Sequence, residues 1–121
     1  IGTARAQSKT VYLLSWGGTI QTTLEKEGWA KKFKEATGYE VVLVPKATTG
    51  EIMATALAQR SRPQVDLVMC DYVGWVNGPR QNLFDTVERS EIPNLAKVAK
   101  NAVIEKDGKL FFEQPASSVL A

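Results

Sequence analysis

The chain has 121 residues, about the length of one domain, and its 44% apolar and 23% charged residues are ordinary for a globular protein with a modest core. Its net charge of +2 comes from interspersed lysines and glutamates instead of a one-signed stripe, which argues against nucleic-acid binding. Histidine is absent and Cys70 is the single cysteine, so the commonest general base and metal ligand are missing and no internal disulfide can form.

The beginning of the chain has features of an exported protein. Ala4-Arg5-Ala6 follows the small-x-small pattern found at the end of secretory signals, so we expect residues 1–8 to be a tail left after export. No stretch approaches the roughly 18 apolar residues that a membrane-spanning helix needs. These features favour a periplasmic or extracellular location.

The first half of the chain alternates strands with helices. Residues 9–16 form a nearly continuous apolar run that predicts a buried strand, and Gly17-Gly18 ends it. Thr22 and Glu25 have the spacing of a capping box, so a helix is expected to begin there and to end at Gly38. Residues 39–44 are rich in β-branched side chains and predict a second strand, closed by Pro45.

The same unit then repeats. Thr48 and Glu51 form a second capping box that opens another helix, and Pro63 ends that segment. Residues 65–70 predict a third buried strand. The order β-α-β-α-β with short connections predicts an α/β fold, with a partial doubly wound and mainly parallel sheet.

The regular alternation of predicted strands and helices ends at Asp71. Residues 72–76 predict one helical turn, residues 77–79 a tight turn, and residues 92–99 a short helix. Residues 102–112 predict a hairpin around Asp107-Gly108. Three parallel strands and a hairpin leave unpaired sheet edges, so we expect self-association or strand exchange through them.

The candidate ligand site follows from this topology. In open parallel sheets ligands bind beyond the carboxyl ends of the strands. The loops expected at that edge contribute the following residues: Ser15, Trp16, Gly17, Thr48, Thr49, Gly50, Asp71 and Tyr72. Trp16 is expected to stack on a ligand and Asp71 to act as a counter-ion, although Trp16 also suits the core and the threonines and Asp71 also suit helix caps.

These groups favour binding over catalysis. Hydroxyls, backbone N–H groups, an indole and a carboxylate orient a small molecule, but no base is at hand to activate Ser15 or the threonines, so no catalytic residue is predicted. Gly17-Gly18 lacks the spacing of a dinucleotide fingerprint, and the scattered carboxylates lack the spacing of an EF-hand. No cofactor and no metal site are therefore expected.

Several stretches, in their order and spacing, resemble the start of a mature extracellular solute-binding protein, the receptor component of an ABC importer. They are residues 11–19, 33–41, 64–71, 92–95 and 106–110, and the similarity runs from about Lys9 to Pro115. The most similar branch contains polyamine and ferric-iron receptors. The iron sites of such receptors commonly use clusters of tyrosine and histidine, and here only Tyr72 is suitably placed. A polyamine or similar small polar organic molecule is therefore the expected solute.

The resemblance implies a two-lobed periplasmic-binding fold of type II that closes on a solute and is recognised by a membrane permease. Residues 9–115 would then be the incomplete first lobe, and residues 116–121 the start of the crossing to a second lobe. An N-terminal piece of this kind is expected not to clamp a ligand by itself.

Two other interpretations stay open. One is a self-sufficient, flavodoxin-like regulatory or binding domain, for which only Asp71 supplies an acidic residue at the strand ends. The other is an asparaginase-like amidohydrolase, because Gly17-Gly18-Thr19-Ile20 follows a strand. Trp16 occupies the position of that family's nucleophilic threonine. The family's second signature, a Gly-Thr-Asp-Thr run, is missing from the sequence.

Overall fold

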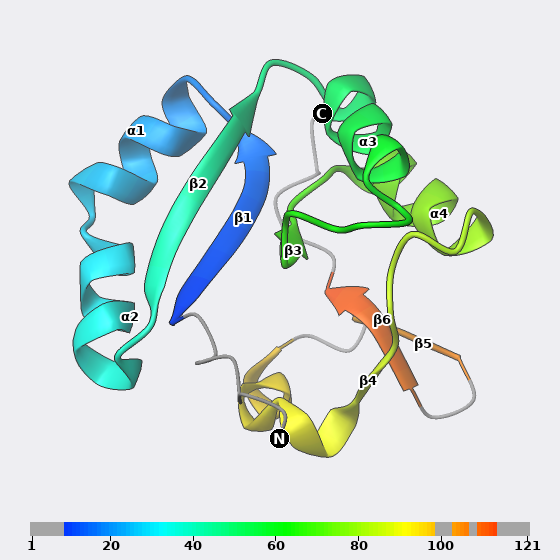
Figure 1. The fold of residues 1–121 in the computed structure, drawn as a ribbon. Helices are drawn as coiled ribbons and strands as arrows, with labels where there is room; N and C mark the ends of the chain where they lie inside the picture. Colours follow the sequence, from blue (N-terminus) through cyan, green and yellow to red (C-terminus); the bar gives the residue numbers. More distant parts are fainter. Residues whose placement is uncertain (1–8, 99–102, 107–108, 114–121) are drawn as a thin grey trace, which may run out of the picture.

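The computed structural model describes residues 9–98, 103–106 and 109–113, and the structural statements that follow concern these residues. The chain is α/β, as predicted (Figure 1). Its elements are β1 (Thr10–Trp16), α1 (Thr19–Lys26), α2 (Trp29–Thr37), β2 (Glu40–Lys46), α3 (Thr49–Ala58), β3 (Leu67–Val68), α4 (Tyr72–Arg80), β4 (Val87–Glu88), the 3-10 helices η1 (Arg89–Glu91) and η2 (Pro93–Lys97), β5 (Val103–Lys106) and β6 (Lys109–Glu113).

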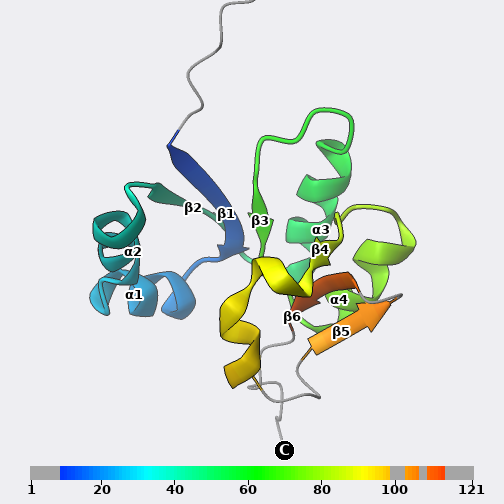
Figure 2. The same cartoon turned by 90° about the horizontal axis from the view of Figure 1, so that it is seen from below.

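The main sheet is parallel and has the strand order β2-β1-β3. The helices α1 and α2 lie on one side of it, and α3 and α4 lie on the other (Figures 1 and 2). This arrangement is the start of a doubly wound sheet, because the chain moves from β1 to one neighbour and then returns past β1 to the other.

The third strand is shorter than the six residues predicted for it. β3 pairs with β1 only through Leu67 and Val68, although Asp66 N and Met69 N donate to Tyr12 O and Leu14 O and so extend the contact on both sides. The Asp66 carboxylate also accepts from Tyr12 N at 2.8 Å. This side chain takes the place of a backbone carbonyl and holds β3 in register with β1.

The first crossover consists of two helices instead of the single one predicted. The prediction of a capping box at Thr22 is wrong: α1 already begins at Thr19, and the Thr22 hydroxyl donates to Gly18 O within the helix, at 2.9 Å. Gly28 then adopts a left-handed conformation with φ of 62° and separates α1 from α2. Glycine reaches this conformation without the steric cost that a Cβ imposes, so the helix breaks here.

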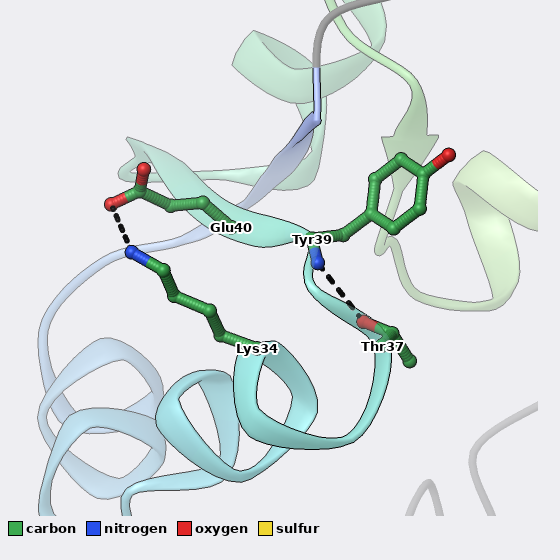
Figure 3. A network of polar contacts seen from close by, with 4 residues as sticks. All are labelled: Lys34, Thr37, Tyr39 and Glu40. Atoms are coloured by element: carbon green, nitrogen blue, oxygen red, sulfur yellow. Dashed lines mark hydrogen bonds and ion pairs between the residues drawn. The ribbon is translucent and has the colours of Figure 1, made fainter.

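The end of α2 is as predicted. Gly38 is left-handed, with φ of 78°, and its N–H donates to Lys34 O. Figure 3 shows two further links between this helix end and β2: Tyr39 N donates to Thr37 Oγ1 at 3.2 Å, and Lys34 Nζ lies 3.9 Å from Glu40 Oε1. These links set the direction in which the chain enters β2.

Two predicted chain breaks at proline are wrong. Pro45 lies inside β2, in register with Ser15, because β2 is an outer strand of the sheet and an outer strand tolerates a missing backbone donor. Pro79 lies in the last turn of α4, and residues 77–79 are helical instead of forming a turn. The cap that Asp71 provides starts this helix, and Pro79 comes too late in it to prevent its formation.

The core lies between the sheet and α3 and α4. Leu14, Ile52 and Cys70 are its buried centre, and the partly buried apolar side chains around them include Trp16, Val44, Val68, Trp75 and Phe84. Because Leu14 comes from β1, Ile52 from α3 and Cys70 from the end of the β3 segment, this core fixes the carboxyl ends of the strands relative to the two helices.

A second sheet, antiparallel and with the order β4-β6-β5, follows α4 in the chain. The hairpin of β5 and β6 is confirmed, whereas β4 was not predicted. The helix predicted at residues 92–99 is instead the 3-10 helix η2, whose Leu95 is buried. Asp107, Gly108, the tail at residues 1–8 and the crossing at residues 116–121 lie outside the described residues.

Candidate functional site

The loops after β2 and β3 meet at the carboxyl edge of the main sheet, and a direct hydrogen bond joins them. Thr49 Oγ1 donates to Asp71 Oδ2 at 2.7 Å. Thr49 is the first residue of α3, and Asp71 precedes the first residue of α4. This bond therefore ties together the beginnings of two helices that are 22 residues apart in the chain.

Both helices begin at capped residues. The Thr48 hydroxyl accepts from Glu51 N at 3.1 Å, and Glu51 Oε2 accepts from Ala47 N at 2.9 Å. The second capping box is thus confirmed, although its returning bond reaches Ala47 instead of Thr48. Asp71 Oδ1 accepts from Val73 N and Gly74 N, at 3.0 and 3.3 Å. Caps of this kind fix the loops in place before any ligand arrives.

The exposed aromatic side chain near this edge is Tyr72. It is 57% exposed, and its ring lies 5.1 Å from the ring of Trp75, centroid to centroid, at an interplanar angle of 33°. Trp16 is partly buried and packs against the core. The Tyr72 ring is therefore exposed at the beginning of α4, but Tyr72 is not among the residues that line the two depressions described below.

Ser15 lies inside the protein. It is fully buried, and its hydroxyl lies 3.5 Å from Met69 Sδ. Gly17 N donates to Lys46 O at 2.9 Å, which connects the β1 loop to the end of β2. Of the predicted residues, the structure brings Thr48, Thr49, Gly50 and Asp71 together, puts Gly17 at a neighbouring position, and encloses Ser15.

Two open depressions lie along this edge. The first, of about 720 Å³, is lined by the loops that follow β1 and β2: Gly17, Gly18, Gln21, Pro45, Lys46, Ala47 and Glu51. The second, of about 420 Å³, is a groove between the beginning of α3 and one face of α4: Thr48, Thr49, Gly50, Met53, Asp71, Val73, Asn77 and Gln81. We call the second depression the α3–α4 groove.

Sequence reasoning missed Asn77 and Gln81. They follow Val73 at intervals of four residues, so Val73 and Asn77 lie on one face of α4, and Gln81, the residue that caps its end, continues this face. The interval was present in the sequence, but residues 77–79 were predicted to be a turn, and a turn does not place Asn77 above Val73. Asp71 was predicted to suit a helix cap, but the helix after it was predicted to end at residue 76, whereas α4 continues to Arg80.

Cys70 is not a reactive group. Burial, with a smaller contribution from the negative charge of Asp71, raises the pKa of its thiol from 9.0 to about 11. The thiol is therefore protonated at neutral pH and is a poor nucleophile. Among the described residues no cluster of three or more acidic, cysteine or histidine side chains is arranged to hold a metal ion.

In the part of the chain that the structure describes, none of the helices has the length and hydrophobicity needed to cross a lipid bilayer. Neither the models of known protein families nor the curated proteins compared with the chain give a match.

Proposed function

We propose that the chain is part of the solute-binding receptor of an ABC importer, acting outside the cytoplasm. In this role it captures a small solute, a polyamine or a similar polar organic molecule, at the carboxyl edge of its parallel sheet and delivers it to a membrane permease. It binds the solute without transforming it. The resemblance of its sequence to such receptors and its doubly wound topology both support this role.

The observation that carries the proposal is the hydrogen bond between Thr49 and Asp71. It joins two loops beside the α3–α4 groove, at the edge where α/β proteins hold their ligands. The polar groups gathered there include the hydroxyls of Thr48 and Thr49 and the carboxylate of Asp71, which bind and orient a molecule. The thiol of Cys70, which precedes Asp71, adds no nucleophile to this set because it is buried and protonated.

A solution NMR titration tests this site directly. A single lobe cannot clamp a solute, but its groove still binds the solute weakly, and NMR detects weak binding residue by residue. The ¹⁵N-labelled chain is titrated separately with spermidine, putrescine, glutamine and glucose. We expect at least one solute to shift the amide signals of residues 48–50 and 71–74 while leaving those of α2 in place. Absence of any such shift at millimolar solute would refute the proposed site.

A pair of matched variants makes the test specific. Thr49→Val removes the hydroxyl that donates to Asp71, whereas Thr55→Val removes a hydroxyl of the same helix that donates to Glu51 O at 2.8 Å. We expect the first substitution to weaken binding and the second to leave it unchanged. Native mass spectrometry of the protein from osmotic-shock fluid then tests the location outside the cytoplasm and weighs any bound solute.

A further inference from the structure

One face of α4 supplies half of the α3–α4 groove. Val73, Asn77 and Gln81 succeed one another along this face, opposite Thr48, Thr49 and Gly50 at the beginning of α3. Met53 closes the groove between the two helices. The wall made by α4 thus consists of one apolar side chain and two carboxamides.

The two carboxamides have no partner among the described residues. No hydrogen bond links the side chain of Asn77 or of Gln81 to another described side chain or backbone group, although Asn77 is half-buried in the groove wall. A carboxamide offers two donors and an acceptor without a net charge. Such a group pairs well with hydroxyl and amide groups, which also both donate and accept.

Asp71 is the only charged side chain among the described residues that line the groove. Its carboxylate accepts three hydrogen bonds, from Val73 N, Gly74 N and Thr49 Oγ1. Two of these come from the amino end of α4, whose partial positive charge offsets the charge of the carboxylate. The groove therefore offers a polycation of several positive charges a single carboxylate, about half of whose charge the amino end of α4 offsets.

From this balance we infer that the solute carries no net charge and is rich in hydroxyl or amide groups, and that Asn77 and Gln81 select it by hydrogen bonding. This inference rests on the proposed function and narrows it, because it favours a solute without net charge over a polyamine. Asn77 and Gln81 become the residues that determine specificity, while Thr49 and Asp71 hold the loops in position.

The test compares two double variants by the same NMR titration. The first variant, Asn77→Ala with Gln81→Ala, removes both carboxamides of the groove. The second, Asn94→Ala with Gln64→Ala, is the control and removes one asparagine and one glutamine side chain outside the groove. The probes are glucose and glutamine, as uncharged and zwitterionic solutes with hydroxyl or amide groups, and spermidine as a polycation. We expect glucose or glutamine to bind more tightly than spermidine, and the first double variant to weaken this binding at least about tenfold while the second leaves it unchanged.

A charge variant provides an independent measurement. Asn77→Asp keeps the size of the side chain and adds a negative charge that no helix end compensates. We expect it to raise the affinity for spermidine several-fold and to lower that for glucose, with the amide signals of Leu14 and Ile52 confirming an intact core.

The outcomes separate the two proposals. Tightest binding of spermidine, or full binding by the variant that lacks both carboxamides, would overturn the selection by Asn77 and Gln81 and leave the proposed function standing. No shift at residues 48–50 and 71–74 with any probe would overturn both.

Discussion

Gly78 is a residue whose lack of a side chain is required by packing. It is buried in α4, and a Cβ built on it would overlap the ring of Phe84. Although alanine is intrinsically about 1 kcal/mol better than glycine inside a helix, overpacking costs about 1–3 kcal/mol and should dominate here. We expect Gly78→Ala to lower the free energy of unfolding measured with urea.

Gly50 is the matched control for that substitution. A Cβ there would lie 3.6 Å from Thr48 Oγ1, which is an ordinary van der Waals contact. Gly50→Ala should therefore stabilise the protein by up to about 1 kcal/mol through helix propensity alone. Equal effects of the two substitutions would contradict the contact between Gly78 and Phe84.

The thiol of Cys70 makes stability depend on alkaline pH. Its pKa rises from 9.0 to about 11 on folding, so the unfolded chain loses this proton at a lower pH than the folded chain does. The thiol's contribution is complete below pH 9 and is lost as the pH rises towards 11, at about 1.4 kcal/mol per unit of pKa difference.

Urea denaturation at pH 8 and at pH 10.5 measures this loss. Cys70→Ala removes the titrating group, so the variant should lose less stability between the two pH values than the original protein loses. For each protein, the free energy of unfolding at pH 10.5 is subtracted from that at pH 8. This difference cancels the cost of the cavity that Cys70→Ala leaves, and comparing the two proteins cancels the titration of lysines and tyrosines that both contain. An identical loss in both proteins would show that Cys70 contributes nothing.

Among the described helices, α3 and α4 begin at a side-chain cap whereas α1 does not, so the threonines of α3 and α1 can be compared. Thr48 lies just before α3, and its hydroxyl accepts from Glu51 N in the first turn. Thr22 lies inside α1, and its hydroxyl donates to Gly18 O. Replacing a capping threonine by alanine costs about 1 kcal/mol, and replacing one in a helix interior is near neutral or favourable. We expect Thr48→Ala to be destabilising and Thr22→Ala to be within about 0.5 kcal/mol of the original protein in chemical denaturation.

The contrast between these threonines explains what sequence patterns can and cannot predict at this scale. Both have a glutamate three residues on, but only Thr48 follows a strand whose end leaves it extended, with φ of −137°. Thr22 comes four residues after Gly18, the residue that precedes α1. It therefore already lies inside the helix and cannot cap its beginning. A capping pattern is therefore informative only once the end of the preceding strand is known.

At the scale of the whole molecule, β3 is one of the two outer strands of the main sheet as described, and its Leu67 is 56% exposed. An outer strand with an exposed apolar side chain pairs readily with another chain. We expect the protein to self-associate through this edge, and Leu67→Lys to reduce the association in sedimentation velocity experiments. Leu57→Lys, on α3 where Leu57 is 46% exposed, is the control that should have no effect.

A protein that sediments as a monomer at all concentrations would contradict this expectation. So would equal effects of the lysine substitutions at positions 57 and 67, since a general loss of exposed apolar surface would then account for both.

The parallel arrangement and the site edge were predictable because long apolar runs and β-α-β order constrain topology strongly. The second sheet was only half predictable: β4 has two residues, Val87 and Glu88, and so short a strand has no periodicity to recognise. The meeting of Thr48, Thr49, Gly50 and Asp71 followed from topology, whereas the enclosure of Ser15 depends on Met69 packing over it, a contact between residues far apart in the chain.

The bond between Thr49 and Asp71 pre-organises the edge of the sheet. A hydroxyl is the donor and a carboxylate is the acceptor, and the two loops are held by each other while the groove is empty. Because the loops are already ordered, a molecule that enters the groove does not have to order them, and the entropic cost of capture is correspondingly small.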